Sequence, residues 1–426
     1  MVRQPLGRAF ANLFAANLAS SLGDGIARTA IPLLGARLTS DPLLIAGLGA
    51  LAMLPWLFFA IPSGILIDRI DRRRALALAQ AVRTLLGLLL VVLVATGTLT
   101  IWWLYLVIFV YGAFETVYDG AIRAVVPSIV DKANLPRANS RIEGGELVVQ
   151  NFVSGPLTSA LFAVAVVIPL GINGLVFAIA GALALLLPKA ASGRQFATAD
   201  EPRVPWYRQL TEGLSFILGN RMLRTLWFFT TFIGLVCSAA MAAFVLYVLD
   251  TLAVPEAFFG LVLVAGAVGG ILGASVTSIL KTRLGVGLTM AIVCTLTGLS
   301  FVLMGVVPVL WAGTIGFALS SLSITTWNIL IMSLRQALIP GRLLGRVHGT
   351  WRTLLWGTMP FGTLIGGFVA RVDLALPFWL FGALEVVATL LFFRFLMTLP
   401  NPEDVDNGDA PTPDTGAGPT DPLAQG

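Results

Sequence analysis

The chain carries very little charge for its length. Only 12% of its 426 residues are Asp, Glu, Lys or Arg, whereas 57% are hydrophobic. A soluble domain carries about 25% charged residues, so this composition excludes a water-soluble globular protein. It predicts a polytopic membrane protein, in which most side chains face lipid or a neighbouring helix.

Histidine and cysteine are also scarce, which excludes several kinds of chemistry. The one histidine, His348, stands in a basic stretch, and the two cysteines, Cys237 and Cys294, lie apart in apolar stretches. These residues supply neither a metal-ligand cluster nor a disulfide framework, and a membrane enzyme would need a nucleophile or a metal constellation. We therefore expect no catalytic residue, no metal and no cofactor, and a protein that is not an enzyme.

The net charge of +5 would point to nucleic acid in a soluble protein, but here the basic residues stand between long apolar runs. We therefore expect no nucleic acid partner. With the N-terminus inside, the inner loops and both ends hold 23 Lys and Arg residues, and the outer loops hold two, Arg37 and Arg371. Cytoplasmic loops carry such an excess. We expect a monomeric, multi-pass protein of the cell (inner) membrane with both termini in the cytoplasm.

Long apolar runs fill most of the chain. A helix needs about 20 apolar residues to cross a bilayer. Twelve such runs lie near residues 10–36, 42–67, 75–96, 101–123, 140–165, 167–187, 224–249, 256–280, 286–306, 309–334, 347–370 and 375–397. They predict an all-α membrane protein with twelve transmembrane helices in two six-helix, pseudo-symmetric bundles.

Two segments lack such runs. After the sixth run, residues 206–218 place apolar side chains at helical spacing, which predicts an amphipathic helix along the cytoplasmic membrane surface. The end of the chain is rich in Pro, Gly and Asp, which predicts disorder. The expected parts are an N-terminal bundle, a cytoplasmic linker, a C-terminal bundle and a disordered tail, at residues 1–187, 188–223, 224–398 and 399–426.

The turn between the second and third runs holds six charges within residues 68–74. Each such charge at a bilayer centre costs roughly 2.5–3.5 kcal/mol, so the turn is expected to stay cytoplasmic. Its pattern resembles the loop 2–3 signature of the major facilitator superfamily, which usually has Gly where this chain has Asp71. The matching residues are Gly64, Leu66, Asp68, Arg69, Arg72 and Arg73.

This turn is a candidate gating loop. We expect Asp68 to hold the cytoplasmic end of the second span against a helix of the other half in the outward-open state, and Arg69, Arg72 and Arg73 to pair with inner-loop acids such as Asp131. The corresponding turn of the second half has no acid, so the latch would be one-sided. The alternative is a topology marker without a gating role.

Charged side chains inside the spans are few, and each is a functional hypothesis because charge is costly in lipid. Asp24 and Arg28 lie one helical turn apart in the first span, so they share a face and can pair. Glu115 and Asp119 have the same spacing in the fourth span, and Arg83 in the third is a candidate partner for the carboxylates. For Asp119, near the inner interface, a structural ion pair is the alternative.

The fifth span carries two acids at the head of a polar stripe. Glu143 and Glu146 are followed by Gln150, Ser154 and Thr158 at steps that keep all five on one helical face. Such a stripe cannot face lipid, so we expect it to line a wet cavity or to contact another helix. A structural pair at the inner interface is the alternative for Glu143.

A buried carboxylic acid can take up a proton on one side of a membrane and release it on the other. We expect Asp24, Glu115 or Glu146 to do so, with a proton gradient as the driving force. Glu385, in the twelfth run, has no polar neighbours in the sequence, and we expect a structural role for it.

A Gly-Pro pair marks the fifth span. In antiporters of the superfamily this span carries Gly-x-x-x-Gly-Pro-x-x-Gly-Gly, and the matching residues here are Asn151, Gly155, Pro156, Ser159 and Ala160. The central pair is kept, and Pro bends a helix. The partial match favours export, and a second Pro, Pro360, is expected to break the eleventh span likewise.

The wider sequence resembles the macrolide-efflux and siderophore-exporter branch of the superfamily. The resemblance rests on residues 22–34 in the first span, 114–119 in the fourth, 212–216 in the linker and 345–347 before the eleventh. It implies a proton-driven exporter of a small lipophilic drug or secondary metabolite. The alternatives are an importer or lipid carrier of the same fold, or a transport-inactive membrane sensor.

Overall fold

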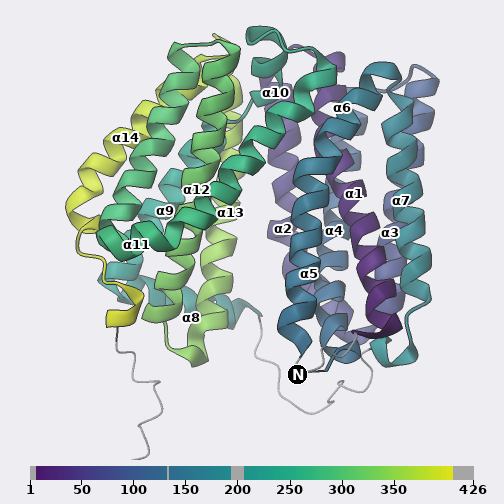
Figure 1. Ribbon diagram of the computed structural model, residues 1–426, viewed down its shortest axis with the longest axis horizontal. Coiled ribbons are helices and arrows are strands. Elements are labelled where there is room, and N and C mark those ends of the chain that lie inside the picture. Colours follow the sequence, from purple (N-terminus) through teal and green to yellow (C-terminus); the bar gives the residue numbers. More distant parts are fainter. Residues whose placement is uncertain (1–5, 132–133, 193–205, 406–426) are drawn as a thin grey trace, which may run out of the picture.

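The computed structural model describes residues 6–131, 134–192 and 206–405, which form two bundles of long helices side by side (Figure 1). The described residues contain no strand. The first bundle holds α1 (Gly7–Leu38), α2 (Pro42–Arg69), α3 (Arg72–Ala95), α4 (Ile101–Ile129), α5 (Leu135–Val148), the π-helix η2 (Val149–Val153), α6 (Ser154–Val164) and α7 (Val167–Leu185). The second holds α8 (Trp206–Gly219), α9 (Arg221–Ala240), α10 (Phe244–Leu246), the π-helix η5 (Tyr247–Thr251), α11 (Glu256–Val306), α12 (Leu310–Leu338), α13 (Gly341–Ala370) and α14 (Leu376–Leu396).

The helices account for twelve membrane crossings, as the apolar runs predict. Ten helical segments of the described chain are long and apolar enough to cross a bilayer, and one of them joins α5, η2 and α6. The longest, α11, makes two crossings because Gly285 leaves the helical conformation at φ 78°. The twelfth crossing is α1, whose 32 residues are long enough although Asn, Ser, Asp and Arg lower its hydropathy.

Helix α8 lies at one end of the molecule, which we call the α8 end; the opposite end, where α10 lies, is the α10 end (Figure 1). The amphipathic helix predicted at residues 206–218 is α8, and its Glu212 accepts a hydrogen bond from Arg346 of α13 at 2.5 Å. Linker residues 193–205 and tail residues 406–426 lie outside the described part. Within the first, described residues of the predicted tail, Glu403 pairs with Lys281 at 2.6 Å.

The fifth span departs from a regular helix just before Pro156. Residues 149–153 form η2, and the Ser154 hydroxyl donates to the carbonyl of Val149 at 2.7 Å. Proline removes an N–H and crowds the preceding turn, which accounts for a wider turn here. The polar stripe predicted for this span is therefore not continuous, because η2 shifts the register between Glu146 and Ser154. In the eleventh span the expectation of a break is wrong, since α13 runs through Pro360 as one helix.

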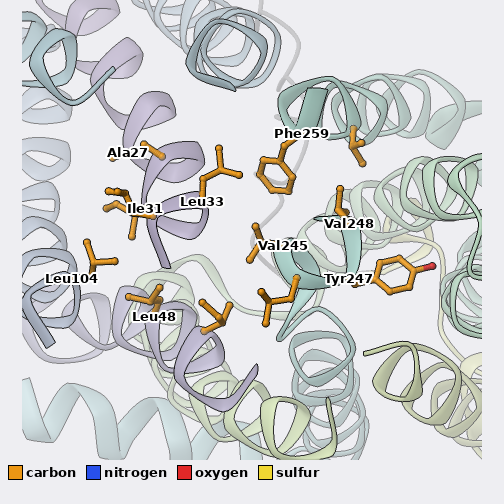
Figure 2. Close-up of a cluster of buried hydrophobic side chains, with 14 of the residues drawn as sticks. Ala27, Ile31, Leu33, Leu48, Leu104, Val245, Tyr247, Val248 and Phe259 are labelled. Atoms are coloured by element: carbon orange, nitrogen blue, oxygen red, sulfur yellow. The ribbon is translucent and has the colours of Figure 1, made fainter. Parts of the chain in front are cut away.

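The seam between the bundles is apolar at the α10 end. Figure 2 shows Leu33 of α1 close to Phe259 of the second bundle, with Val245 nearby. Ile31 lies on the other side of α1, toward Leu104 of the first bundle, and Tyr247 points away from α1 into the second bundle. Burying the apolar side chains at this seam removes their surface from water or lipid. This burial holds the two bundles together where α1 meets α10 and η5.

Candidate functional site

A buried ion pair links the first and third helices. Asp24 of α1 is 7% exposed and pairs with Arg83 of α3, whose side chain is fully buried. The Tyr111 hydroxyl also donates to the Asp24 carboxylate, at 2.8 Å. The predicted Asp24–Arg28 pair is therefore wrong, because helix packing turns Asp24 toward α3 and α4 while Arg28 points elsewhere.

Arg83 is held by neutral groups as well as by its carboxylate partner. Its guanidinium lies 4.3 Å from the ring centre of Tyr111 and 4.2 Å from that of Phe177, both favourable cation–π distances. A terminal nitrogen of Arg83 donates to Ser20 at 3.3 Å, and Gln80 donates to the same hydroxyl at 2.8 Å. A buried charge persists only when it is paired and hydrogen-bonded, so this network fixes the Asp24–Arg83 pair.

Arg28 is held far less tightly. Its side chain is 63% exposed, and its contact with Glu115 is an ion pair at 3.5 Å. That distance is longer than a hydrogen bond of 2.7–3.2 Å, and Arg28 makes no hydrogen bond to any described residue. The geometry therefore gives Glu115, rather than Asp24, a loose and solvent-accessible cationic partner.

The fourth helix presents its two acids to a cavity of about 360 Å³, which we call the acidic cavity. Its wall includes Asp24, Arg28, Glu115 and Asp119 of the first bundle, with Trp56 of α2 and Trp356 of α13. The Asp119 carboxylate has no hydrogen bond or ion pair within the described part of the chain. Three carboxylates and one arginine thus face this cavity, and one carboxylate has no direct cationic partner.

One tryptophan from each bundle lines the acidic cavity, and an arginine of the second bundle lies against both rings. The rings of Trp56 and Trp356 lie 6.0 Å apart. The guanidinium of Arg352, on α13, lies 5.2 Å from the first ring centre and 4.8 Å from the second. The cavity is therefore walled by flat apolar surfaces that suit a lipophilic molecule.

A second and larger cavity, of about 810 Å³, lies between α1, η2, α11 and α12; we call it the wide cavity. Arg28 lines it too and is its only charged residue. Its other polar lining residues are Thr29, Gln150, Asn151, Ser275, Ser321 and Thr325. Arg28 is thus shared by the acidic and the wide cavity.

At the α10 end, two pairs of charged side chains join the bundles. Arg37 of α1 donates to both carboxylate oxygens of Glu256 of α11, at 3.0 and 2.6 Å. Arg371, after α13, donates to both oxygens of Asp41, before α2, at 2.8 and 2.5 Å. The Arg371 guanidinium holds the pKa of Asp41 below its usual range. Each bundle contributes one arginine and one acid, so the two pairs are reciprocal.

The Gly-Pro pair of the fifth span lies at a close contact between the bundles. A methyl group at Gly155 would stand 3.3 Å from the carbonyl oxygen of Gly260 on α11. The Gly260 N–H donates to the Ser159 hydroxyl at 2.8 Å. Small residues permit this backbone contact. Together with the two arginine pairs, this hydrogen bond joins the two bundles.

Comparison with known proteins agrees with this architecture. Residues 4–414 match the model of a family described as transmembrane secretion effectors, of the major facilitator superfamily. The chain belongs to this family. It is 20% identical to macrolide efflux protein A of Streptococcus pyogenes, over 90% of this chain and 94% of that protein. It is 22% identical to YkuC, an MFS-type transporter of Bacillus subtilis, over 92% and 93%.

Solved transporter structures share the fold of this family member. A bacterial homologue of the iron transporter ferroportin, in an inward-facing state, superposes with a TM-score of 0.71 at 18% identity, over 92% of this chain and all of that one. A point mutant of the nucleoside transporter NupG gives 0.74 at 12% identity, over 92% and 100%. The chain is a multi-pass membrane transporter with the major facilitator fold.

The acids of the fifth span lie away from both cavities of this transporter. Glu146 accepts a hydrogen bond from Asn17 of α1 at 2.8 Å, and Glu143 is exposed. Ser154 and Thr158, further along the predicted stripe, are buried. Arg83, a predicted partner for the acids of the fourth and fifth spans, is paired with Asp24 and serves none of them.

The predicted gating loop has a different set of contacts from those expected. The carboxylate of Asp71 caps α3 by accepting from the Arg73 N–H at 3.0 Å and pairs with the Arg73 guanidinium at 2.8 Å. Arg72 donates to the carbonyl of Ala124 at 2.8 Å. Among the described residues, neither Arg72 nor Arg73 pairs with Asp131, and the latch of the outward-open state stays a prediction. The side chains of Gly64, Asp68 and Arg69 lie outside the described residues.

Glu385 has polar neighbours that the sequence did not reveal. It is 1% exposed on α14, and the Cys237 thiol of α9 donates to its carboxylate at 3.5 Å. The Thr389 hydroxyl donates to the Glu385 carbonyl at 2.9 Å. These residues lie 148 and 4 positions apart from Glu385, and only the packing of α9 on α14 brings the thiol close.

Proposed function

We propose that this transporter exports a small lipophilic drug or secondary metabolite by alternating access, in exchange for protons. The observation that carries the proposal is the acidic cavity, where the Asp119 carboxylate has no direct cationic partner among the described residues. Exporters named for macrolide efflux among the relatives support the direction of transport, and the kept Gly155–Pro156 pair supports it as well.

The contacts of the acids favour Asp119, with Glu115 beside it, as the proton carrier. Protonation of Asp24 would break a buried ion pair, which costs roughly 3–5 kcal/mol. Protonation of Asp119 breaks no ion pair with a described residue, and that of Glu115 loosens only a contact at 3.5 Å. Glu146 is bound to Asn17 outside the cavities. A proton and a lipophilic substrate that share the acidic cavity compete for it, as exchange requires.

The remaining expectations on partners and location belong to this proposal. The closed seam at the α10 end corresponds to a state open toward the α8 end, where most cations of the chain gather. We place the α8 end and both termini in the cytoplasm of a monomeric protein of the cell membrane. Its partners are then the bilayer and the substrate, with no nucleic acid, and the proton gradient takes the place of a cofactor.

The test is proton flux in proteoliposomes. Purified protein is reconstituted with a pH-sensitive dye inside, a radiolabelled macrolide is supplied as the probe, and substrate flux and proton flux are recorded together. We expect each to drive the other. Asp119→Asn should abolish the coupling, whereas the matched control Glu143→Gln, on an exposed acid, should leave it intact. Wild-type macrolide flux without proton movement, or unchanged coupling in Asp119→Asn, would overturn the proposal.

A further inference from the structure

The wide cavity collects polar side chains that make no hydrogen bond within the described part of the chain. Arg28, Gln150, Ser321 and Thr325 line it, and none of the four makes a hydrogen bond to a described residue. Inside a membrane protein an unsatisfied polar group is costly. Groups of this kind, gathered around about 810 Å³ of space, are satisfied by water or by a ligand.

The π-helix η2 explains part of this arrangement. Its Gln150, Asn151 and Phe152 all border the wide cavity, although they are consecutive in the chain. π-helical turns inside longer helices occur frequently at functional sites. On the opposite wall, Gly266, Gly270 and neighbouring small residues of α11 remove bulk. The fold thus widens the space on one side and places amides on the other.

The charge and the chemistry of the lining define the ligand. The wide cavity has no acid, so a cation gains nothing there, and its one guanidinium offers five N–H donors. The amides and hydroxyls both donate and accept. The volume lies within the 300–1,000 Å³ typical of ligand pockets, toward the upper end. Such a site suits a large uncharged molecule with many carbonyl, ether or hydroxyl oxygens.

We propose that the wide cavity is a binding site for an uncharged, oxygen-rich ligand and that Arg28 is its specificity-determining residue. Arg28 donates to a ligand oxygen on one side while Glu115 remains near it on the other, at 3.5 Å. This assignment rests on the proposed function, since the ligand of the wide cavity is the transported substrate, bound next to the acidic cavity. Gln150 and Thr325 supply the neighbouring hydrogen bonds.

Equilibrium binding to purified protein in detergent, without any pH gradient, tests the site separately from proton coupling. The probes are a tritiated, uncharged macrocyclic lactone and tetraphenylphosphonium, a lipophilic cation. We expect Arg28→Gln to weaken lactone binding about tenfold or more, because a hydrogen bond from a charged group is lost. Binding of the cation should stay the same or strengthen, since a positive charge has been removed.

Milder variants cover the case in which Arg28→Gln fails to fold. Thr325→Val removes one hydroxyl at constant volume, and Ala274→Leu fills part of the cavity; both should weaken lactone binding several-fold. Ser333→Ala on α12 is the matched control, because Ser333 lines neither cavity, and it should bind like the wild type. Absence of lactone binding to the wild type, or unchanged affinity in Thr325→Val and Ala274→Leu, would overturn the assignment. Neither result depends on proton flux.

Discussion

The reciprocal arginine pairs at the α10 end make a quantitative prediction about the closure of that end. Replacing Arg37 and Arg371 by Ala removes both pairs, whose side chains are 28–44% exposed. Partly exposed pairs contribute roughly 0.2–1 kcal/mol each, so two of them contribute about 0.5–2 kcal/mol. That corresponds to a roughly 2- to 30-fold shift toward the state that is open at the α10 end. The apolar seam of Figure 2 supplies the rest of the closure.

Spin-label distances measure this shift directly. The labels are placed at Thr98 and Val309, exposed positions of the two bundles near the α10 end, in a protein whose two cysteines have been replaced. The double variant should gain population at long distances. Raising the salt concentration should move the wild type in the same direction, because exposed pairs are screened.

Two controls separate the pairs from a general loss of structure. Arg37→Glu alone should lengthen the distances, and adding Glu256→Arg, which exchanges the two partners, should restore the short distances. Lys281→Ala removes a pair within the second bundle and should change nothing at the α10 end. An unchanged distance distribution in the double variant, at low salt, would refute the reasoning.

The pair of Asp41 and Arg371 also predicts how the closure of the α10 end responds to a fall in pH. The pKa of Asp41 lies below its ordinary value of 3.8 because of its hydrogen bonds with Arg371. A lowered pKa means that the stabilisation is fully present above 3.8 and is lost as the pH falls through the lowered value. The Asp41–Arg371 pair should therefore stay intact between pH 7 and pH 5, and in Asp119→Asn, which lacks the proposed proton carrier, the distances should stay constant over that range.

Three further substitutions test the packing of the bundles. Arg83→Met leaves Asp24 buried without its partner and should lower the unfolding free energy by roughly 3–5 kcal/mol, seen as a lower melting temperature in detergent. Asp71→Ala removes the cap of α3 and should cost about 1 kcal/mol in the same assay. Gly260→Ala places a methyl against the backbone of α6 and should favour opening at the α10 end in the spin-label assay, whereas Gly171→Ala, with nothing within 4 Å, should not.

The sequence predicted those features of the fold that depend on the residues of a single segment. Runs of apolar residues predict helices that cross a membrane, and the twelve crossings are confirmed. The amphipathic helix α8 was recognised because its apolar residues keep helical spacing within one segment. The break at Gly285 inside α11 coincides with the expected boundary between two runs, although the helix continues almost without a loop.

Pairing between helices could not be predicted, because spacing orders residues on one helix and says nothing about how helices rotate against each other. Asp24 and Arg28 share a face, yet Asp24 pairs with Arg83, 59 positions away. The count of cations singled out Arg37 and Arg371, but their partners lie 219 and 330 positions away. Likewise, η2 has no signal in the sequence except the proline that follows it.

The two bundles contribute different side chains to the two cavities, and this difference constrains how transport can work. The acids of the acidic cavity all come from α1 and α4, and the second bundle adds tryptophan there. The second bundle contributes the small residues and several hydroxyls of the wide cavity. Arg28 alone carries charge into both cavities. A proton bound in the first bundle can therefore influence a substrate in the wide cavity most directly through Arg28. If coupling follows this route, Arg28→Lys should keep the charge yet lose the guanidinium donors, and so weaken binding more than it weakens proton uptake.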